Sequence, residues 1–118
     1  KGVDVVYDPV GGELSEQAIR ATAWEGRFLV IGFAAGDIPK IPLNIVMLKG
    51  CDIRGVFWGA ALDRDPEGHR RNMKELLTWV SEGKLKPHIH GVYKLAETAT
   101  ALEEIAARRV QGKVIVTP

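Results

Sequence analysis

The chain has 118 residues, 46% of them hydrophobic, and 16 basic against 15 acidic side chains give a net charge of +1. This length suffices for one compact unit with a core. The near-neutral charge gives no electrostatic footprint for nucleic acid or an anionic membrane, no apolar run approaches the ~20 residues that span a bilayer, and no signal peptide is visible.

The amino-terminal residues have the pattern of a βαβ unit. Val3–Tyr7 is short, β-branched and aromatic and stops at Asp8, which predicts a buried strand. A helix is expected over Glu13–Trp24, with Gly26 just past its end, and Phe28–Ile31 is predicted to be a second buried strand. Two strands and a helix within about 30 residues indicate parallel strands with a right-handed crossover.

The middle of the chain predicts two helices around a third strand. Leu43–Lys49 is expected to be a short helix ended by Gly50, and Cys51, the only cysteine, is expected to be a buried core thiol. The third strand is expected over Ile53–Trp58. The Asp65–Pro66 pair predicts the start of a long helix, because Asp caps well and Pro suits the first helical position. One face of that helix would carry Met73, Leu76, Leu77 and Val80.

The carboxy-terminal residues predict a strand, a helix and a strand. The strands are expected over Gly91–Leu95 and Lys113–Thr117, and the helix over Glu97–Arg109, with Gly112 beyond its end. Its inward residues would be Ala99, Leu102, Ile105 and Ala106. Alternation of strands and helices predicts the α/β class with a parallel sheet, whose ligands bind at the carboxyl ends of the strands.

Two of the predicted strands end in glycine-rich stretches, 8–12 and 31–36. Glycine allows a ligand to approach the backbone closely, but it also suits tight turns that bind nothing. The spacing alone leaves both interpretations open.

Six motifs in this order have a familiar arrangement. They are residues 5–12, 26–36, 41–50, 54–59, 83–87 and 111–116. Together they resemble the carboxy-terminal part of the zinc-independent, quinone-oxidoreductase-like (zeta-crystallin-like) family of the medium-chain dehydrogenase/reductase superfamily. The resemblance implies that 1–86 is the carboxy-terminal half of a Rossmann cofactor-binding domain, with strands four to six of its sheet. Residues 87–118 would return toward a GroES-like catalytic domain. Both parts are expected to form one compact unit in this chain.

The resemblance also implies a longer parent protein. The first predicted strand begins only two residues after Lys1, and no G-x-G-x-x-G follows a strand. We therefore expect the pyrophosphate fingerprint to lie in a missing amino-terminal part of the same enzyme. A cytoplasmic location is expected from the composition.

The resemblance implies where NADPH, or alternatively NADH, would lie. Val10 and Gly11 would border the cofactor. The nicotinamide side would be lined by Ile31, Gly32, Phe33 and Ala34, and the same ring would be flanked by Gly55, Val56 and Phe57. Trp58 would lie near the substrate cleft. Arg108 would help to hold the cofactor, although a cation that favours the carboxyl end of a helix is an equally simple explanation.

Other chemistry has little support in the residues. His88 and His90 could share one face of a strand, but a third ligand is not evident, and no metal is expected. No Ser-His-Asp arrangement or carboxylate pair is suggested, and no proton donor stands out.

The resemblance implies a fragment, inactive alone, of an NAD(P)H-dependent oxidoreductase that transfers hydride from NADPH to a quinone or activated alkene, its small-molecule substrate. An enoyl-thioester reductase of the same superfamily and a non-catalytic dimerisation or binding module remain open. A homodimer through the strand Ile53–Trp58 is expected, because an apolar edge strand invites pairing.

Overall fold

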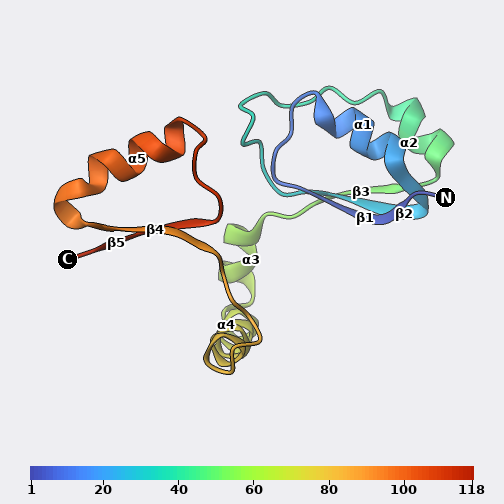
Figure 1. Ribbon diagram of the computed structural model, residues 1–118. Coiled ribbons are helices and arrows are strands. Elements are labelled where there is room, and N and C mark those ends of the chain that lie inside the picture. Colours follow the sequence, from blue (N-terminus) through green and yellow to red (C-terminus); the bar gives the residue numbers. More distant parts are fainter. The chain divides into compact units, whose positions relative to one another are not determined.

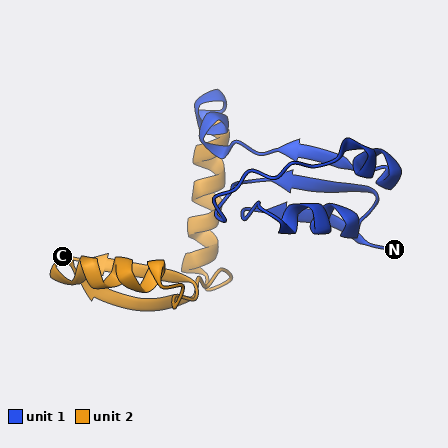
Figure 2. Cartoon of the chain, turned by 90° about the horizontal axis from the view of Figure 1, so that it is seen from above, with its two compact units in different colours: residues 1–66 blue, residues 67–118 orange.

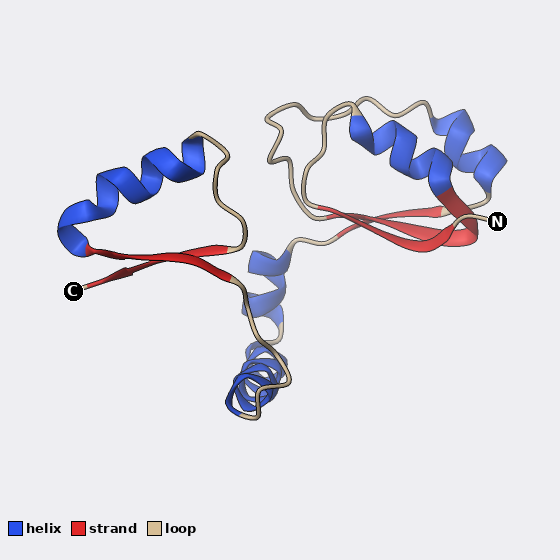
Figure 3. Ribbon diagram, viewed as in Figure 1, coloured by secondary structure: helices blue, strands red, loops and turns tan.

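The chain forms two compact units. The computed structural model describes all 118 residues, and Figure 2 shows its units, Lys1–Pro66 and Glu67–Pro118. This differs from the single compact unit expected from the sequence, because the strands form two separate sheets, each with helices of its own unit (Figure 3). The division at residue 86 concerns the domains that each part resembles, and it stays a prediction.

Unit 1 contains a three-stranded parallel sheet in the order β1-β2-β3. Its elements are β1 (Val3–Asp8), α1 (Leu14–Ala21), β2 (Thr22–Val30), α2 (Leu43–Lys49), β3 (Asp52–Gly55) and α3 (Trp58–Arg64). Helices α1 and α2 lie on one face of the sheet (Figure 1). Ile19 of α1, Phe28 of β2, Ile45 of α2 and Cys51 form the core, so Cys51 is the buried thiol expected from the sequence.

The opposite face of this sheet is covered by neither α1 nor α2. Val3, Val5 and Tyr7 of β1 are 49%, 56% and 66% exposed. Paired residues of parallel strands point the same way, so Arg27 and Leu29 of β2, which pair with Val5 and Tyr7, lie on this open face too. The expectation of a buried first strand is therefore wrong, because no residue of β1 is fully buried and Val6 is only partly buried against the core.

The boundary between α1 and β2 differs from the prediction. The helix ends at Ala21 rather than Trp24, because Thr22 is already extended and its backbone N–H closes the helix on the Ile19 carbonyl. Gly26 lies within β2, not just beyond a helix. A Cβ at Gly26 would stand 2.6 Å from Cγ2 of the fully buried Thr22, so close packing is what favours glycine at this position.

The third strand is shorter than predicted, and a helix follows it. Gly55 pairs with Val30, the last residue of β2, so the ladder has no partner strand beyond this point. Trp58 consequently begins α3 instead of ending β3. By contrast, α2 has the predicted bounds, and Gly50 ends it in the left-handed conformation with φ 54°.

Unit 2 contains a parallel pair of strands and two longer helices. Its elements are α4 (Pro66–Ser81), which starts at the unit boundary, β4 (Ile89–Lys94), a 3₁₀ turn η1 (Leu95–Glu97), α5 (Thr98–Ala106) and β5 (Lys113–Thr117). Helix α4 begins at Pro66 as predicted. None of the helices in the chain is both long and apolar enough to cross a membrane.

The inward face of α5 differs from the prediction. Ala101 is the buried residue, whereas Leu102 and Ile105 are 60% and 50% exposed. A 3₁₀ turn precedes the helix, and in it the Glu97 carboxylate accepts a hydrogen bond from the Lys94 N–H at 2.8 Å. Hydrophobic periodicity alone did not identify which face of α5 is buried.

Candidate cofactor site

A pocket of about 230 Å³ lies where β2 and β3 end. It is lined by Val30, Ile31, Phe33, Gly55, Val56 and Phe57. All but Val30 were predicted to contact the cofactor, so the fold brings these two distant segments together. The Val56 N–H donates to the Val30 carbonyl at 2.9 Å and holds the exit of β3 beside the end of β2.

Two loops meet beside this pocket, and backbone hydrogen bonds join them. The first loop (residues 9–13) follows β1, and the second loop (residues 31–42) follows β2. The N–H groups of Ala34 and Ala35 donate to the carbonyls of Pro9 and Val10 at 3.1 and 2.9 Å. The Gly12 N–H donates in the reverse direction, to the Asp37 carbonyl at 3.1 Å. The shape of each loop therefore depends on the other.

Gly11 lies in the first loop beside Phe33 and Asp37 of the second loop. It is buried and has φ 70°, a left-handed conformation that other residues adopt only at a cost. A Cβ at this position would lie 2.8 Å from Cδ1 of Phe33, which lines the pocket. Glycine at position 11 therefore lets the Phe33 ring pack against the first loop.

Asp8, the last residue of β1, fixes the first loop. Its Oδ1 accepts hydrogen bonds from the N–H groups of Val10 and Gly11, both at 2.9 Å, and its Oδ2 accepts one from the Ser15 hydroxyl at 2.7 Å. Burial alone would raise the pKa of this carboxyl. The three hydrogen bonds, that from Gly11 first, outweigh burial and hold the pKa below its ordinary value of 3.8.

The remaining predicted site residues lie beside the pocket or away from it. Val10, Gly32 and Ala34 belong to the two loops but do not line the pocket. Trp58 begins α3 and is 63% exposed. Arg108 belongs to unit 2, where it follows α5 with φ 55°, and its contact with the cofactor stays a prediction.

Sequence reasoning missed Asp8 and Ser15 as site residues. Asp8 was taken only as part of a turn that ends the strand. An aspartate two and three residues before amides of a glycine turn can accept hydrogen bonds from both, and this signal was available. Ser15 had no comparable signal, because its hydroxyl reaches Asp8 only once α1 has folded back along the sheet.

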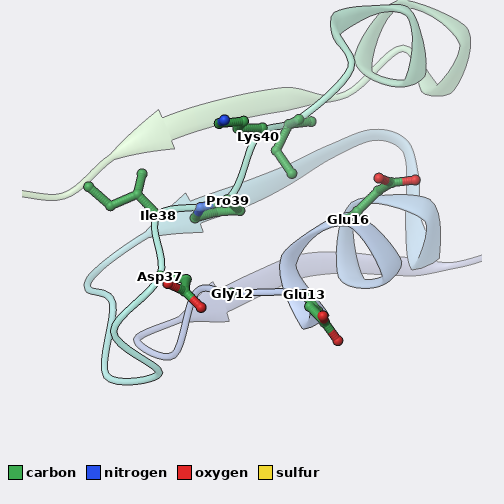
Figure 4. A pocket seen from close by; sticks show the side chains of 8 residues that line it. Gly12, Glu13, Glu16, Asp37, Ile38, Pro39 and Lys40 are labelled. Carbon is green, nitrogen blue, oxygen red and sulfur yellow. The ribbon is translucent and has the colours of Figure 1, made fainter.

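A second hollow, of about 460 Å³, is lined by Gly12, by Glu13 and Glu16 at the start of α1, and by residues 37–41 of the second loop. Figure 4 shows the carboxylates of Glu13, Glu16 and Asp37 together with Lys40 at its rim. Glu16 is already paired with Arg20 at 2.7 Å.

No group of three or more His, Cys, Asp or Glu side chains in the chain is arranged to hold a metal ion. Nδ1 of His90 accepts a hydrogen bond from the Gln111 N–H at 3.3 Å. The carbonyl of His88 accepts one from the Lys113 N–H at 2.9 Å. These bonds tie the start of β4 to the residues around the start of β5.

The parallel sheet of unit 1, the helices α1 and α2 on one of its faces and the pocket at the ends of β2 and β3 define an α/β domain with parallel strands, a class in which ligands bind at the carboxyl ends of the strands. A family model described as "Zinc-binding dehydrogenase" matches residues 1–116, and the chain belongs to this family. The resemblance to quinone-oxidoreductase-like members of the medium-chain superfamily and the α/β class with parallel strands are thereby confirmed.

Individual relatives agree with this assignment. The chain is 36% identical over 116 residues to "Quinone oxidoreductase-like protein 2 homolog" of Nematostella vectensis, a match that covers 98% of this chain and 32% of that protein. A quinone oxidoreductase structure from Pseudomonas syringae superimposes with a TM-score of 0.82 at 28% identity, over 100% of this chain and 36% of that one. A mycobacterial structure complexed with NADPH has the same fold, with a TM-score of 0.82 at 24% identity over 99% and 36% of the two chains. The chain thus spans about a third of the length of these proteins.

Proposed function

We propose that this chain holds the nicotinamide end of NADPH in an oxidoreductase that transfers hydride to a quinone or activated alkene. The observation that carries the proposal is the pocket at the ends of β2 and β3, lined by five residues that the family resemblance assigns to the cofactor. Its volume of about 230 Å³ is below the ~300–1,000 Å³ of whole-ligand sites, so it suits one ring of a dinucleotide.

The residues present fit this ring. A Cβ at Gly55 would meet nothing within 4 Å, so the pocket is open in front of its backbone. Phe33 and Phe57 provide flat apolar walls, and the backbone of the two strand exits is available to orient a carboxamide. When bound, NADPH would supply the hydride, and these residues would orient the ring and exclude water. NADH would fit the same pocket, because this part of the site does not contact the adenosine phosphate.

The rest of the site is proposed to come from residues outside this sequence. The related proteins are about three times as long, and no G-x-G-x-x-G is present here to bind the pyrophosphate. We therefore expect no turnover by residues 1–118 alone. By the same resemblance, hydride transfer is proposed to need no zinc; the one cysteine that could ligate a metal is buried in the core of unit 1.

A homodimer through β3 belongs to the proposal. β3 is an edge strand, so one of its sides has no partner in the sheet. In a strand, alternate N–H groups point the same way. Because the Val56 N–H points toward β2, the Ile53 N–H points toward the open side, where a β3 strand of a second copy could accept its hydrogen bond.

Sedimentation velocity at rising protein concentration tests for the homodimer. A chain that stays monomeric at the high concentrations used for NMR would contradict it.

Titration calorimetry tests the cofactor proposal. NADPH and reduced nicotinamide mononucleotide are titrated into residues 1–118 and into a protein that extends this sequence toward its amino terminus. We expect weak binding of both ligands to the short chain, since it offers only the nicotinamide side. Tight binding of NADPH is expected only in the longer protein. Absence of NADPH binding in the longer protein would exclude the proposal.

A further inference from the structure

We propose that Asp8 is a positioning residue, which holds both loops of the cofactor pocket in one shape through its carboxylate. The inference rests on the proposed function, because it assigns a role in that same site. Asp8 does not line the pocket at the ends of β2 and β3. It acts through the backbone, by accepting hydrogen bonds from the N–H groups of Val10 and Gly11.

The influence of Asp8 reaches the pocket through the second loop. Its own carbonyl accepts hydrogen bonds from the N–H groups of Ile31 and Gly32, at 2.9 and 3.3 Å. Its carboxylate fixes Gly11, against which the Phe33 ring packs. One residue thus governs both the start of the second loop and the first-loop surface that supports Phe33.

Ser15 links this arrangement to α1. Its side chain is 1% exposed, and its hydroxyl donates to Asp8 Oδ2 at 2.7 Å. Its N–H donates to the Gly12 carbonyl at 3.3 Å, so the first turn of the helix is tied to the first loop as well. The carboxylate satisfies three donors at once, on the backbone and on a buried hydroxyl. An alanine at position 8 would leave all of them without this partner.

A cavity of about 150 Å³ explains why the loss would be felt at Phe33. It lies behind the second loop and is lined by Asp8 and Ser15 at its polar end and by apolar side chains that include Phe33, Phe28 and Ile38. Phe33 therefore lies between this cavity and the cofactor pocket and has room to move. The hydrogen bonds of Asp8 keep the first loop pressed against the ring and limit this freedom.

The test compares Asp8→Ala, Asp8→Asn and Ser15→Ala with the control Asp4→Ala, which removes an exposed aspartate from the same strand. The first readout is ligand-free amide hydrogen exchange at Ala34 and Ala35, whose N–H groups donate into the first loop. Asp8→Ala is expected to accelerate exchange at both amides and to leave Phe28 in β2 unchanged. Asp8→Asn keeps an acceptor for Val10 and Gly11 and should largely restore protection, and Ser15→Ala should have the smallest effect of the three.

The second readout separates positioning from a general structural role. In the longer protein, Asp8→Ala should raise the KM for NADPH about tenfold, the loss expected for a hydrogen bond to a charged group, with little change in kcat. Unchanged exchange at Ala34 and Ala35, or equal effects of Asp8→Ala and Asp4→Ala, would overturn the inference. If the parent protein does not bind NADPH, the proposed function fails, while exchange still decides whether Asp8 holds the loops. Should Asp8→Ala not fold, Asp8→Asn and Ser15→Ala decide the question by the same exchange measurement.

Discussion

Glycine is favoured at positions 11 and 55 of the candidate site for different physical reasons. At Gly11 the backbone is left-handed and a side chain would strike the Phe33 ring. At Gly55 there is open space where a Cβ would point. The sequence showed both as glycines near strand ends, but it could not separate a residue required by the protein's own packing from one that leaves room for a ligand.

This difference predicts the result of Gly55→Val. The Cβ of the added side chain meets no protein atom within 4 Å, and the residue lines the pocket, so thermal stability should be nearly unchanged. The affinity for NADPH should fall by about tenfold or more, because a blocked ring forfeits its van der Waals contacts. Calorimetry measures the NADPH affinity in the longer protein, and a thermal melt measures its stability. Ala61→Val in α3 is the control, since it adds the same kind of side chain at an exposed position outside the pocket. Equal NADPH affinity in both variants would argue against this pocket.

The lowered pKa of Asp8 predicts an acid-dependent stability. The folded-state pKa lies below the ordinary 3.8, so the carboxylate stabilises the folded chain above that pH. This contribution is lost as the pH falls from 3.8 through the folded-state pKa. Asp8→Asn should flatten this part of the stability profile, which urea unfolding at a series of pH values measures. If the stability of Asp8→Asn falls with pH as steeply as that of the unsubstituted chain, other carboxyl groups are responsible for the acid-dependent loss of stability.

At the scale of elements, the sequence predicted what local chemistry dictates. Helix α2 was placed correctly because Gly50 ends it, and α4 because Pro66 begins it. The end of α1 was missed because the residues up to Trp24 include no helix breaker, and only pairing in the sheet makes Thr22 extended. The pocket was likewise foreseeable from the family motifs, whereas the hydrogen bonds between its loops follow from the folded arrangement.

Gly112, which precedes β5, yields a prediction for unit 2. It has φ 85°, and a Cβ there would collide with the carbonyl of His88. Gly112→Ala is therefore expected to destabilise the strand pair by more than the ~1–3 kcal/mol typical of backbone strain alone. Gly83→Ala is the matched control, because it has a similar φ of 69° but only an ordinary contact with Lys86. Denaturant unfolding of both variants measures the difference, and equal losses would contradict a role for the His88 carbonyl.

At the scale of the whole molecule, the sheet of unit 1 is exposed at more than the edge of β3. The outer edge of β1 also has no partner strand, and the face that carries Val5 and Tyr7 is uncovered. Exposed apolar strands of this kind are prone to association. We expect residues 1–118 alone either to pair the β1 edge with another copy or to be less stable than the longer parent protein. Light scattering and thermal melts of both proteins test this. A monomer of residues 1–118 as stable as the parent would contradict it.

The position of Cys51 has a practical consequence. It is the only thiol of the chain and lies 8% exposed in the core formed by Ile19, Phe28 and Ile45. A thiol reagent reaches the Cys51 sulfur when that core opens, so the labelling rate follows the opening of unit 1, in which Cys51 lies. This natural side chain therefore reports the opening of the unit 1 core without any introduced probe.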